Sequence, residues 1–158
     1  MFALNPDGTE RWSAALEGEV WAGPAIGFDG TLYMGTYNQG GATYVFAPDG
    51  SLLRKVPSRA IHTPIVAGDG SIYYSGGAVA AFDRDGAPKW SFRPENFAGP
   101  APAIGFDGRI YAGASDDDYV HTLYAFEEEA ANNGGYQSAP WPQERGDRAN
   151  TGRALRRP

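Results

Sequence analysis

The sequence contains no cysteine. This absence excludes disulfide bonds, thiolate catalysis and cysteine-ligated metal sites, and it leaves the redox compartment open. Histidine occurs only at His62, just before an expected strand, and at His121, in an expected hairpin. We therefore interpret both histidines as polar loop residues rather than as catalytic bases.

Long apolar runs and catalytic motifs are also missing. No segment approaches the roughly 20 apolar residues that span a bilayer, and no charged start with an apolar core marks a signal peptide. The mature part of an exported protein would look the same, so the compartment stays open. The sequence has no nucleophile elbow, phosphate-binding loop or dinucleotide fingerprint, and residues 75–77 fit a hairpin turn. Any catalysis would depend on carboxylates alone.

Positive charge is scarce outside the C-terminal tail. Residues 1–142 carry a net charge of −9 and residues 143–158 carry +3, which gives −6 for the chain. An acidic body argues against general nucleic-acid binding, because neutralising phosphates requires a basic surface. The basic tail is expected to dock on the acidic body rather than to bind an anionic partner.

The sequence does contain a repeat. A unit with the pattern Pro-Ala-Ile-Gly-Phe-Asp-Gly, or a close variant, starts at Pro24, Pro64 and Pro102. Its Asp-Gly turn lies at Asp29, Asp69 and Asp107, and a second Asp-Gly turn falls between the units at Asp7, Asp49 and Asp85. A period near 40 residues with about four short strands is typical of a β-propeller blade. The 22 glycines and 12 prolines fit such frequent turns.

The strands of two repeats can be placed from their β-forming residues and turns. The first repeat predicts strands at residues 22–26, 31–37, 43–46 and 51–56, and the second at 63–66, 71–75, 79–82 and 88–92. Several of these strands are apolar on both sides, as at residues 79–82. Such strands need cover on both faces, which adjacent propeller blades provide and a two-sheet sandwich does not.

The strand count predicts an incomplete ring. We expect an all-β propeller of four-stranded antiparallel blades, with two whole blades between the last two strands of one and three strands of another, about 13 strands in total. The blades would occupy residues 1–128, followed by a linker and tail at 129–158. A closed ring usually needs four to eight blades. The chain is therefore interpreted as a fragment of a larger propeller, or as a chain that completes a ring by self-association.

Two segments carry a family resemblance. Residues 2–12, ending in Trp12, and residues 81–90, ending in Trp90, resemble the tryptophan-docking motif of quinoprotein-type (PQQ-like) β-propeller repeats. In that family an alanine permits close blade packing, a glycine makes the turn, and the tryptophan lies across the neighbouring blade. The middle repeat departs from the motif with Val45 at the alanine position and Arg54 at the tryptophan position. The last repeat keeps residues 123–126 but continues into 127–129 without a turn or tryptophan.

The tail adds to the resemblance. Trp141-Pro142, Asp147 and Thr151-Gly152-Arg153 resemble a segment that commonly flanks quinoprotein-like propellers. Trp141 stands between two prolines, and leaving its ring in water is costly, so we expect the segment to pack against the blades.

The resemblance implies a scaffold more than an enzyme. Quinoprotein dehydrogenases hold pyrroloquinoline quinone and calcium within a complete propeller, but none of their site motifs can be matched here. We predict a non-catalytic scaffold or protein-interaction module with no cofactor and no metal, whose partner is a protein or a second copy. The alternatives are the C-terminal portion of a PQQ-dependent oxidoreductase, or a structural subunit that polymerises through open blade edges. A periplasmic, cell-envelope or extracellular location follows from the resemblance alone.

Candidate binding residues lie in the loops between blades. These connections gather around one mouth of a propeller channel, and they vary between repeats while the turns do not. The residues singled out are Trp21, Arg59, His62 and Phe97. For Trp21 and Phe97, packing between blades is an equally good interpretation.

Two acidic runs are interpreted as solvated. Three adjacent aspartates at 116–118 are expected at a hairpin tip rather than around calcium, because neighbouring side chains on an extended chain point apart. The glutamates at 127–129 are likewise expected to face water.

Overall fold

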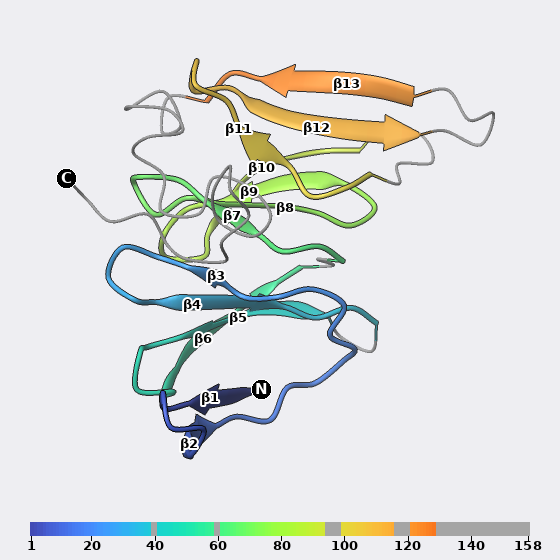
Figure 1. Ribbon diagram of the computed structural model, residues 1–158. Coiled ribbons are helices and arrows are strands. Elements are labelled where there is room, and N and C mark those ends of the chain that lie inside the picture. The colour runs from blue at the N-terminus through green and yellow to red at the C-terminus, as the bar shows by residue number, and fades with distance from the viewer. Residues whose placement is uncertain (39–40, 59–60, 94–98, 116–120, 129–158) are drawn as a thin grey trace.

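The computed structural model describes residues 1–38, 41–58, 61–93, 99–115 and 121–128 (Figure 1). These residues form thirteen strands in four antiparallel sheets, and the described part of the chain contains no helix. The sheets are stacked face to face, as Figure 1 shows, with the β1–β2 ribbon at one end of the stack and β11–β13 at the other. The prediction of an all-β propeller built from four-stranded antiparallel blades is confirmed.

The sheets follow the order of the chain. The strands are β1 (Phe2–Leu4) and β2 (Glu10–Ser13); β3 (Ala25–Ile26), β4 (Leu32–Gly35), β5 (Ala42–Phe46) and β6 (Leu52–Pro57); β7 (Ile65–Val66), β8 (Ile72–Ser75), β9 (Val79–Phe82) and β10 (Pro88–Phe92); and β11 (Ala103–Ile104), β12 (Ile110–Ser115) and β13 (His121–Phe126). Each sheet is a meander in which successive strands pair.

The first strand is shorter than predicted in the two repeats whose strands were placed, with two residues each in β3 and β7, and β11 in the third repeat is equally short. In β3 the pairing starts at Ala25, directly after Pro24, which has no amide hydrogen to donate to a ladder. It ends at the Asp-Gly turn, where the Thr31 amide donates to Asp29 Oδ1 and the Gly30 amide donates to the Gly27 carbonyl. The repeat therefore fixes both ends of this strand.

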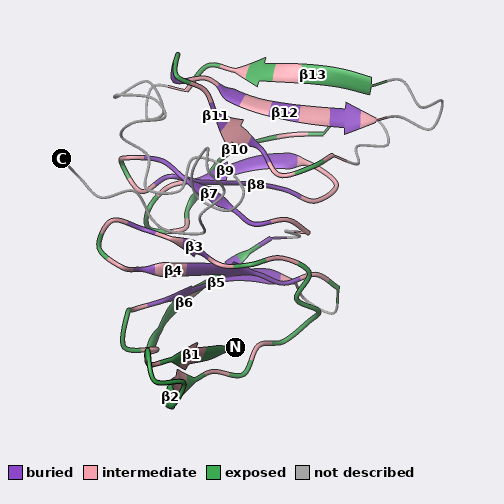
Figure 2. Cartoon of the chain, viewed as in Figure 1, coloured by how far each residue is buried: buried purple, intermediate pink, exposed green. Residues whose placement is uncertain are grey.

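The middle strands are buried on both faces, as Figure 2 shows. Along β9, Ala80 and Phe82 join the core between the two four-stranded sheets, whereas Val79 and Ala81 join cores shared with β11–β13. Successive side chains thus enter opposite junctions, which is why the sequence of this strand does not alternate between apolar and polar residues.

The outermost sheets are exposed by comparison. On β1, Phe2 is 71% exposed, and on β13, Leu123 is also 71% exposed. In the described part of the chain no further sheet covers the outer faces of β1–β2 and β11–β13. Predictions for residues 116–118 and for the tail at 129–158, including Trp141, lie outside the described residues.

Candidate functional site

The loop between β2 and β3 presents Trp21 to solvent. The indole is 67% exposed and its Nε1–H donates to Glu19 Oε2 at 2.9 Å, while Asn38 Nδ2 donates to Glu19 Oε1 at 3.2 Å. The backbone of Glu19 is itself bridged to Tyr37 by two hydrogen bonds of 2.9 Å. Glu19 therefore links the ring to a fixed backbone, and Trp21 is not packed between the described sheets.

Gly18 makes this arrangement possible. Its φ of +88° lies in the left-handed region, and a Cβ there would stand 2.7 Å from the Tyr37 carbonyl oxygen. Any other residue would be strained and would also push the loop away from Tyr37. The glycine was not singled out from the sequence, although it stands directly before Glu-Val-Trp.

The other three candidate loop residues are less informative. Arg59 and Phe97 lie outside the described residues. His62 is half-buried just before β7, and the neighbouring Ile61 amide donates to the Ser75 carbonyl at 3.3 Å. Within the described residues no hydrogen bond joins Trp21 to His62, so a shared binding surface on these loops stays a prediction.

His121 is the first residue of β13, and its side chain is exposed. Its Nδ1 lies 2.8 Å from Ser115 Oγ, at the end of the β12–β13 pair where the two strands are connected. This position agrees with its interpretation as a polar residue of the hairpin.

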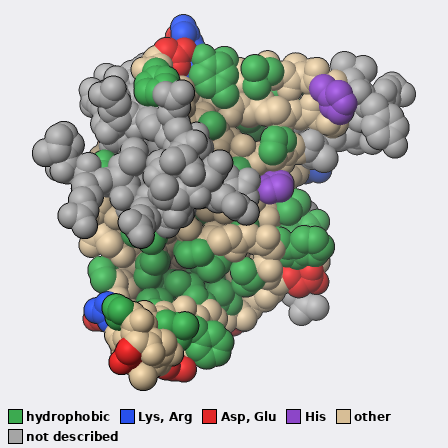
Figure 3. All heavy atoms as spheres, viewed as in Figure 1, with side chains coloured by type: hydrophobic (Ala, Val, Ile, Leu, Met, Phe, Trp, Pro, Cys, Tyr) green, Lys and Arg blue, Asp and Glu red, His purple; other side chains and the backbone are tan. Residues whose placement is uncertain are grey.

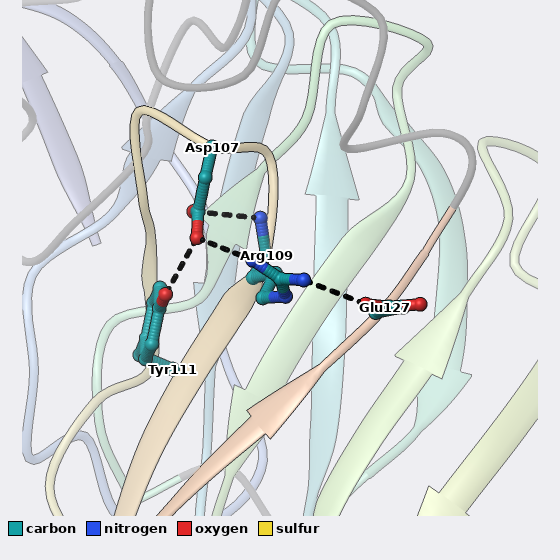
Figure 4. Close-up of polar contacts among 4 residues, drawn as sticks. All are labelled: Asp107, Arg109, Tyr111 and Glu127. Carbon is teal, nitrogen blue, oxygen red and sulfur yellow. Dashed lines mark hydrogen bonds and ion pairs between the residues drawn. The ribbon is translucent and has the colours of Figure 1, made fainter.

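A polar cluster that was not predicted from the sequence ties the β11–β12 turn to Glu127, the residue after β13 (Figure 4). Arg109 contacts Asp107 Oδ2 at 3.0 Å and Glu127 Oε1 at 2.7 Å, and Tyr111 Oη donates to Asp107 Oδ2 at 2.7 Å. The hydrogen bond from Tyr111, with those from Arg109, lowers the pKa of Asp107 to about 2. A carboxylate with that pKa is a poor base near neutral pH. The cluster is therefore a structural clamp.

Its sequence signal was available. Arg109 stands two residues after the turn aspartate, where the earlier repeats have Thr31 and Ser71. In those repeats the Thr31 amide donates to Asp29, and both the amide and the hydroxyl of Ser71 donate to Asp69. The guanidinium adds a second arm that reaches Glu127.

The tryptophan-docking contact is present at the first junction, between the β1–β2 ribbon and the β3–β6 sheet. Trp12 Nε1 donates to the carbonyl of Pro48 at 3.2 Å, and its indole stacks near Phe46 with ring centroids 6.2 Å apart. A Cβ at Gly50 would lie 2.5 Å from Trp12 Cδ2. The ring therefore lies across the turn of the neighbouring sheet, as the family resemblance implies.

At the third junction, between the β7–β10 and β11–β13 sheets, the tryptophan donates to a side-chain carboxylate in place of a backbone carbonyl. The indole of Trp90 stacks on Phe126 with centroids 5.2 Å apart, and its Nε1 donates to Glu128 Oε2. Lys89 Nζ lies 2.5 Å from Glu128 Oε1, and the Glu128 side chain is only 11% exposed. The expectation that Glu128 faces water is wrong, because both oxygens are held by partners on β10. Glu127 is exposed as expected.

The middle junction, between the β3–β6 and β7–β10 sheets, keeps the hydrogen bond of the docking motif without a tryptophan. Arg54 Nη2 donates to the carbonyl of Arg84, which occupies the place of Pro48 in the next repeat. The guanidinium thus replaces the indole as the donor, although it cannot cover the same apolar area. Arg54 therefore preserves the hydrogen bond of the docking motif but does not supply its aromatic ring.

These junctions agree with the comparison against known families. A family model described as outer membrane protein assembly factor BamB matches residues 2–131. The chain belongs to the PQQ-like β-propeller repeat family. No curated protein matches this PQQ-like chain.

Two solved structures resemble the PQQ-like chain. One is a protein of unknown function from Bacteroides caccae, with a TM-score of 0.56, 16% identity, and coverage of 80% of this chain and 50% of that one. The other is BamB from Moraxella catarrhalis, with a TM-score of 0.49, 18% identity, and coverage of 75% of this chain and 40% of that one. The chain thus spans half or less of the length of these relatives, and the first of them supports the fold alone.

Two further observations bear on the site. Among the described residues no group of three or more histidine, aspartate and glutamate side chains is placed to hold a metal ion. No helix in the described ranges is long and apolar enough to cross a membrane.

Proposed function

We propose that the chain is a non-catalytic scaffold or protein-interaction module, and that it forms part of a larger propeller. The observation that carries the proposal is Trp21, an exposed indole whose carboxylate partner is tied to the backbone of another loop. A rigid exposed tryptophan supplies large contact area at little entropic cost, which is typical of binding hot spots.

The exposed outer sheets support the part of the proposal that concerns assembly. Phe2, Leu4 and Leu123 are 71%, 63% and 71% exposed. Figure 3 shows hydrophobic side chains gathered on the face formed by the N-terminal half of the chain. Further blades, supplied by a longer chain or by another copy, would cover such surfaces.

The family also suggests a location. The matching family model is described as an outer membrane protein assembly factor. By that analogy we propose an extracytoplasmic site of action in which the propeller contacts other proteins of a cell envelope.

The experiment compares two exposed apolar residues at opposite ends of the sheets. Trp21 lies in a connecting loop, whereas Leu53 on β6, 51% exposed, lies near the Asp-Gly turns. Affinity capture from an envelope extract would use the wild-type chain, Trp21→Ala and Leu53→Ala. Loss of the retained proteins with Trp21→Ala alone supports the proposal, and equal retention by all three contradicts it.

A direct assay tests the enzymatic alternative. Pyrroloquinoline quinone and calcium would be added to the chain together with an alcohol or aldose and an electron acceptor. Turnover that depends on the quinone would contradict the non-catalytic proposal.

A further inference from the structure

A pocket opens between the two four-stranded sheets, at the end that carries the Asp-Gly turns. Its volume is about 550 Å³, and it lies between the β3–β4 turn, β6 and the turns of the β7–β10 sheet. This size is within the range of small-ligand pockets. Because the strands are antiparallel, the pocket is at the opposite end of the sheets from the Trp21 loop, and it is independent of the function proposed above.

Two guanidinium groups line the pocket, and neither forms an ion pair with a described residue. Arg54 and Arg84 make none of the ion pairs found among the described residues, which involve Lys55, Lys89 and Arg109. Arg54 donates one bond to the Arg84 carbonyl, and its buried Nε has no acceptor in the described part of the chain. A buried donor left without an acceptor is costly, so this site gains from a ligand that accepts hydrogen bonds.

Three turn aspartates also line the pocket. Partial burial would raise the pKa of Asp29, but hydrogen bonds from Thr31 and the charge of Arg84 lower it overall, so Arg84 interacts with this carboxylate without forming an ion pair. Asp29 Oδ1 accepts the Thr31 amide at 3.0 Å, and both oxygens of Asp69 are occupied by Ser71. Asp85 also lines the pocket but forms no ion pair with either arginine. Asp29 and Asp69 are held by their own turns, and none of the three carboxylates forms an ion pair with either guanidinium among the described residues.

The next junction shows what occupies the equivalent space. The strand pairs Ile72–Phe82 and Ile110–Phe126 align the two repeats, so Glu128 is the counterpart of Arg84. By the same spacing Trp90 corresponds to Arg54 and Lys89 to Leu53. There, the Glu128 carboxylate accepts from the Trp90 indole and pairs with Lys89.

The middle junction has therefore exchanged its anion for a cation. It has an arginine where the next junction has the glutamate, and a second arginine where that junction has the tryptophan. At the next junction, burial raises the pKa of the Tyr73 hydroxyl, and the charges of both Glu128 and Asp69 raise it further. Both carboxylates therefore lie near one hydroxyl, so this junction tolerates a carboxylate beside a turn aspartate.

We propose that this pocket binds a carboxylate of a separate ligand between Arg54 and Arg84, in the place that Glu128 occupies at the next junction. Guanidinium groups favour carboxylates because their parallel N–H donors match the two oxygens. The ligand class is a small organic acid or the acidic side chain of a peptide.

Calorimetric titration of the full chain tests the proposal with three probes. These are succinate, the peptide acetyl-Gly-Glu-Gly-Glu-Gly-amide, and inorganic phosphate. Binding of succinate indicates a free acid, and binding of the peptide alone indicates an acidic segment. Preference for phosphate, or no binding of either carboxylate probe at millimolar concentration, would overturn the proposal.

Two variants test whether the carboxylate probes bind in this pocket. Arg84→Glu restores a carboxylate within the chain, and Arg54→Trp restores the docking ring; each should weaken carboxylate binding by more than about tenfold. Arg11→Ala, which removes an exposed arginine outside the pocket, is the matched control and should bind like the wild type. Unchanged binding in both pocket variants would rule the site out.

One measurement follows the wild-type pocket directly and uses a pocket variant only to assign the signal. The Arg54 Nε–H resonance, assigned by its loss in Arg54→Lys, should shift when the bound carboxylate probe is added. If the Arg54 resonance stays fixed while calorimetry reports binding, the ligand occupies another site and the proposal is wrong.

Discussion

The indole of Trp12 lies on the backbone of Gly50, so closely that a single added carbon at Gly50 would stand 2.5 Å from Cδ2 of the ring. This contact joins the β1–β2 ribbon to the next sheet, with a hydrogen bond from the same ring to the Pro48 carbonyl. The turn glycine therefore serves both its own loop, with φ of +90°, and the packing between sheets.

The substitution Gly50→Ala tests this double role against Gly8→Ala. Gly8 has nearly the same φ, +86°, but a Cβ there meets nothing within 4 Å. Gly8→Ala should cost about 1 to 2 kcal/mol from backbone strain alone. Gly50→Ala should cost about 2 to 4 kcal/mol because the ring must also move. Denaturant midpoints measure the difference, and equal losses would show that the ring contact contributes nothing.

Glu128 and Glu127 form a second matched pair. Glu128→Ala leaves the buried side of Lys89 and the Trp90 indole without their acceptor, and it should lower the free energy of unfolding by about 1 to 3 kcal/mol. Glu127→Ala removes an exposed ion pair with Arg109 and should cost roughly 0 to 1 kcal/mol. Thermal unfolding of the two variants compares them. A larger loss for Glu127→Ala would contradict the burial of Glu128.

The Asp107 carboxyl should titrate abnormally. Its folded-state pKa of about 2 lies below the ordinary value of 3.8, so its contribution to stability is present above about pH 4 and is lost as the pH falls toward 2. Tyr111→Phe removes the largest cause of the shift and should raise this pKa. Carboxyl NMR titration measures it, with Asp7 as the control, because Thr9 lowers the Asp7 pKa independently. An unchanged Asp107 pKa in Tyr111→Phe would show that the hydroxyl is not the cause.

Trp21→Ala should leave stability unchanged within about 0.5 kcal/mol, because the ring is exposed and packs in no core. Gly18→Ala should instead destabilise the loop, since its Cβ would clash with the Tyr37 carbonyl. Comparison of the two melting temperatures separates the surface role of the ring from the structural role of the loop. A large stability loss with Trp21→Ala would mean that the ring is part of the fold.

The repeat predicted most of the fold because its signals are local. The turn at Asp29-Gly30 and the proline before β3 determine where strands begin and end through backbone chemistry, which is readable in sequence. The buried state of Glu128 was missed because it depends on Lys89 and Trp90, which lie nearly forty positions away along the chain. A run of three glutamates is ordinarily a solvated face, and only the neighbouring sheet makes one of them internal.

The candidate site was predictable only in part. Trp21 was identified from its place between blades, but its exposure depends on Glu19 and Asn38, a contact that no sequence pattern indicates. Arg54 was recognised as a departure from the docking motif. Its bond to the Arg84 carbonyl and the pocket beside it became visible only when two sheets were placed against each other.

The mass of the chain in solution tests most directly whether these blades need partners. Analytical ultracentrifugation combined with a thermal melt should give a species heavier than the 16.9 kDa of one chain, or a single chain that melts without cooperativity. A clean 16.9 kDa monomer with a sharp cooperative melt would contradict the proposal that the exposed outer sheets are completed by other blades.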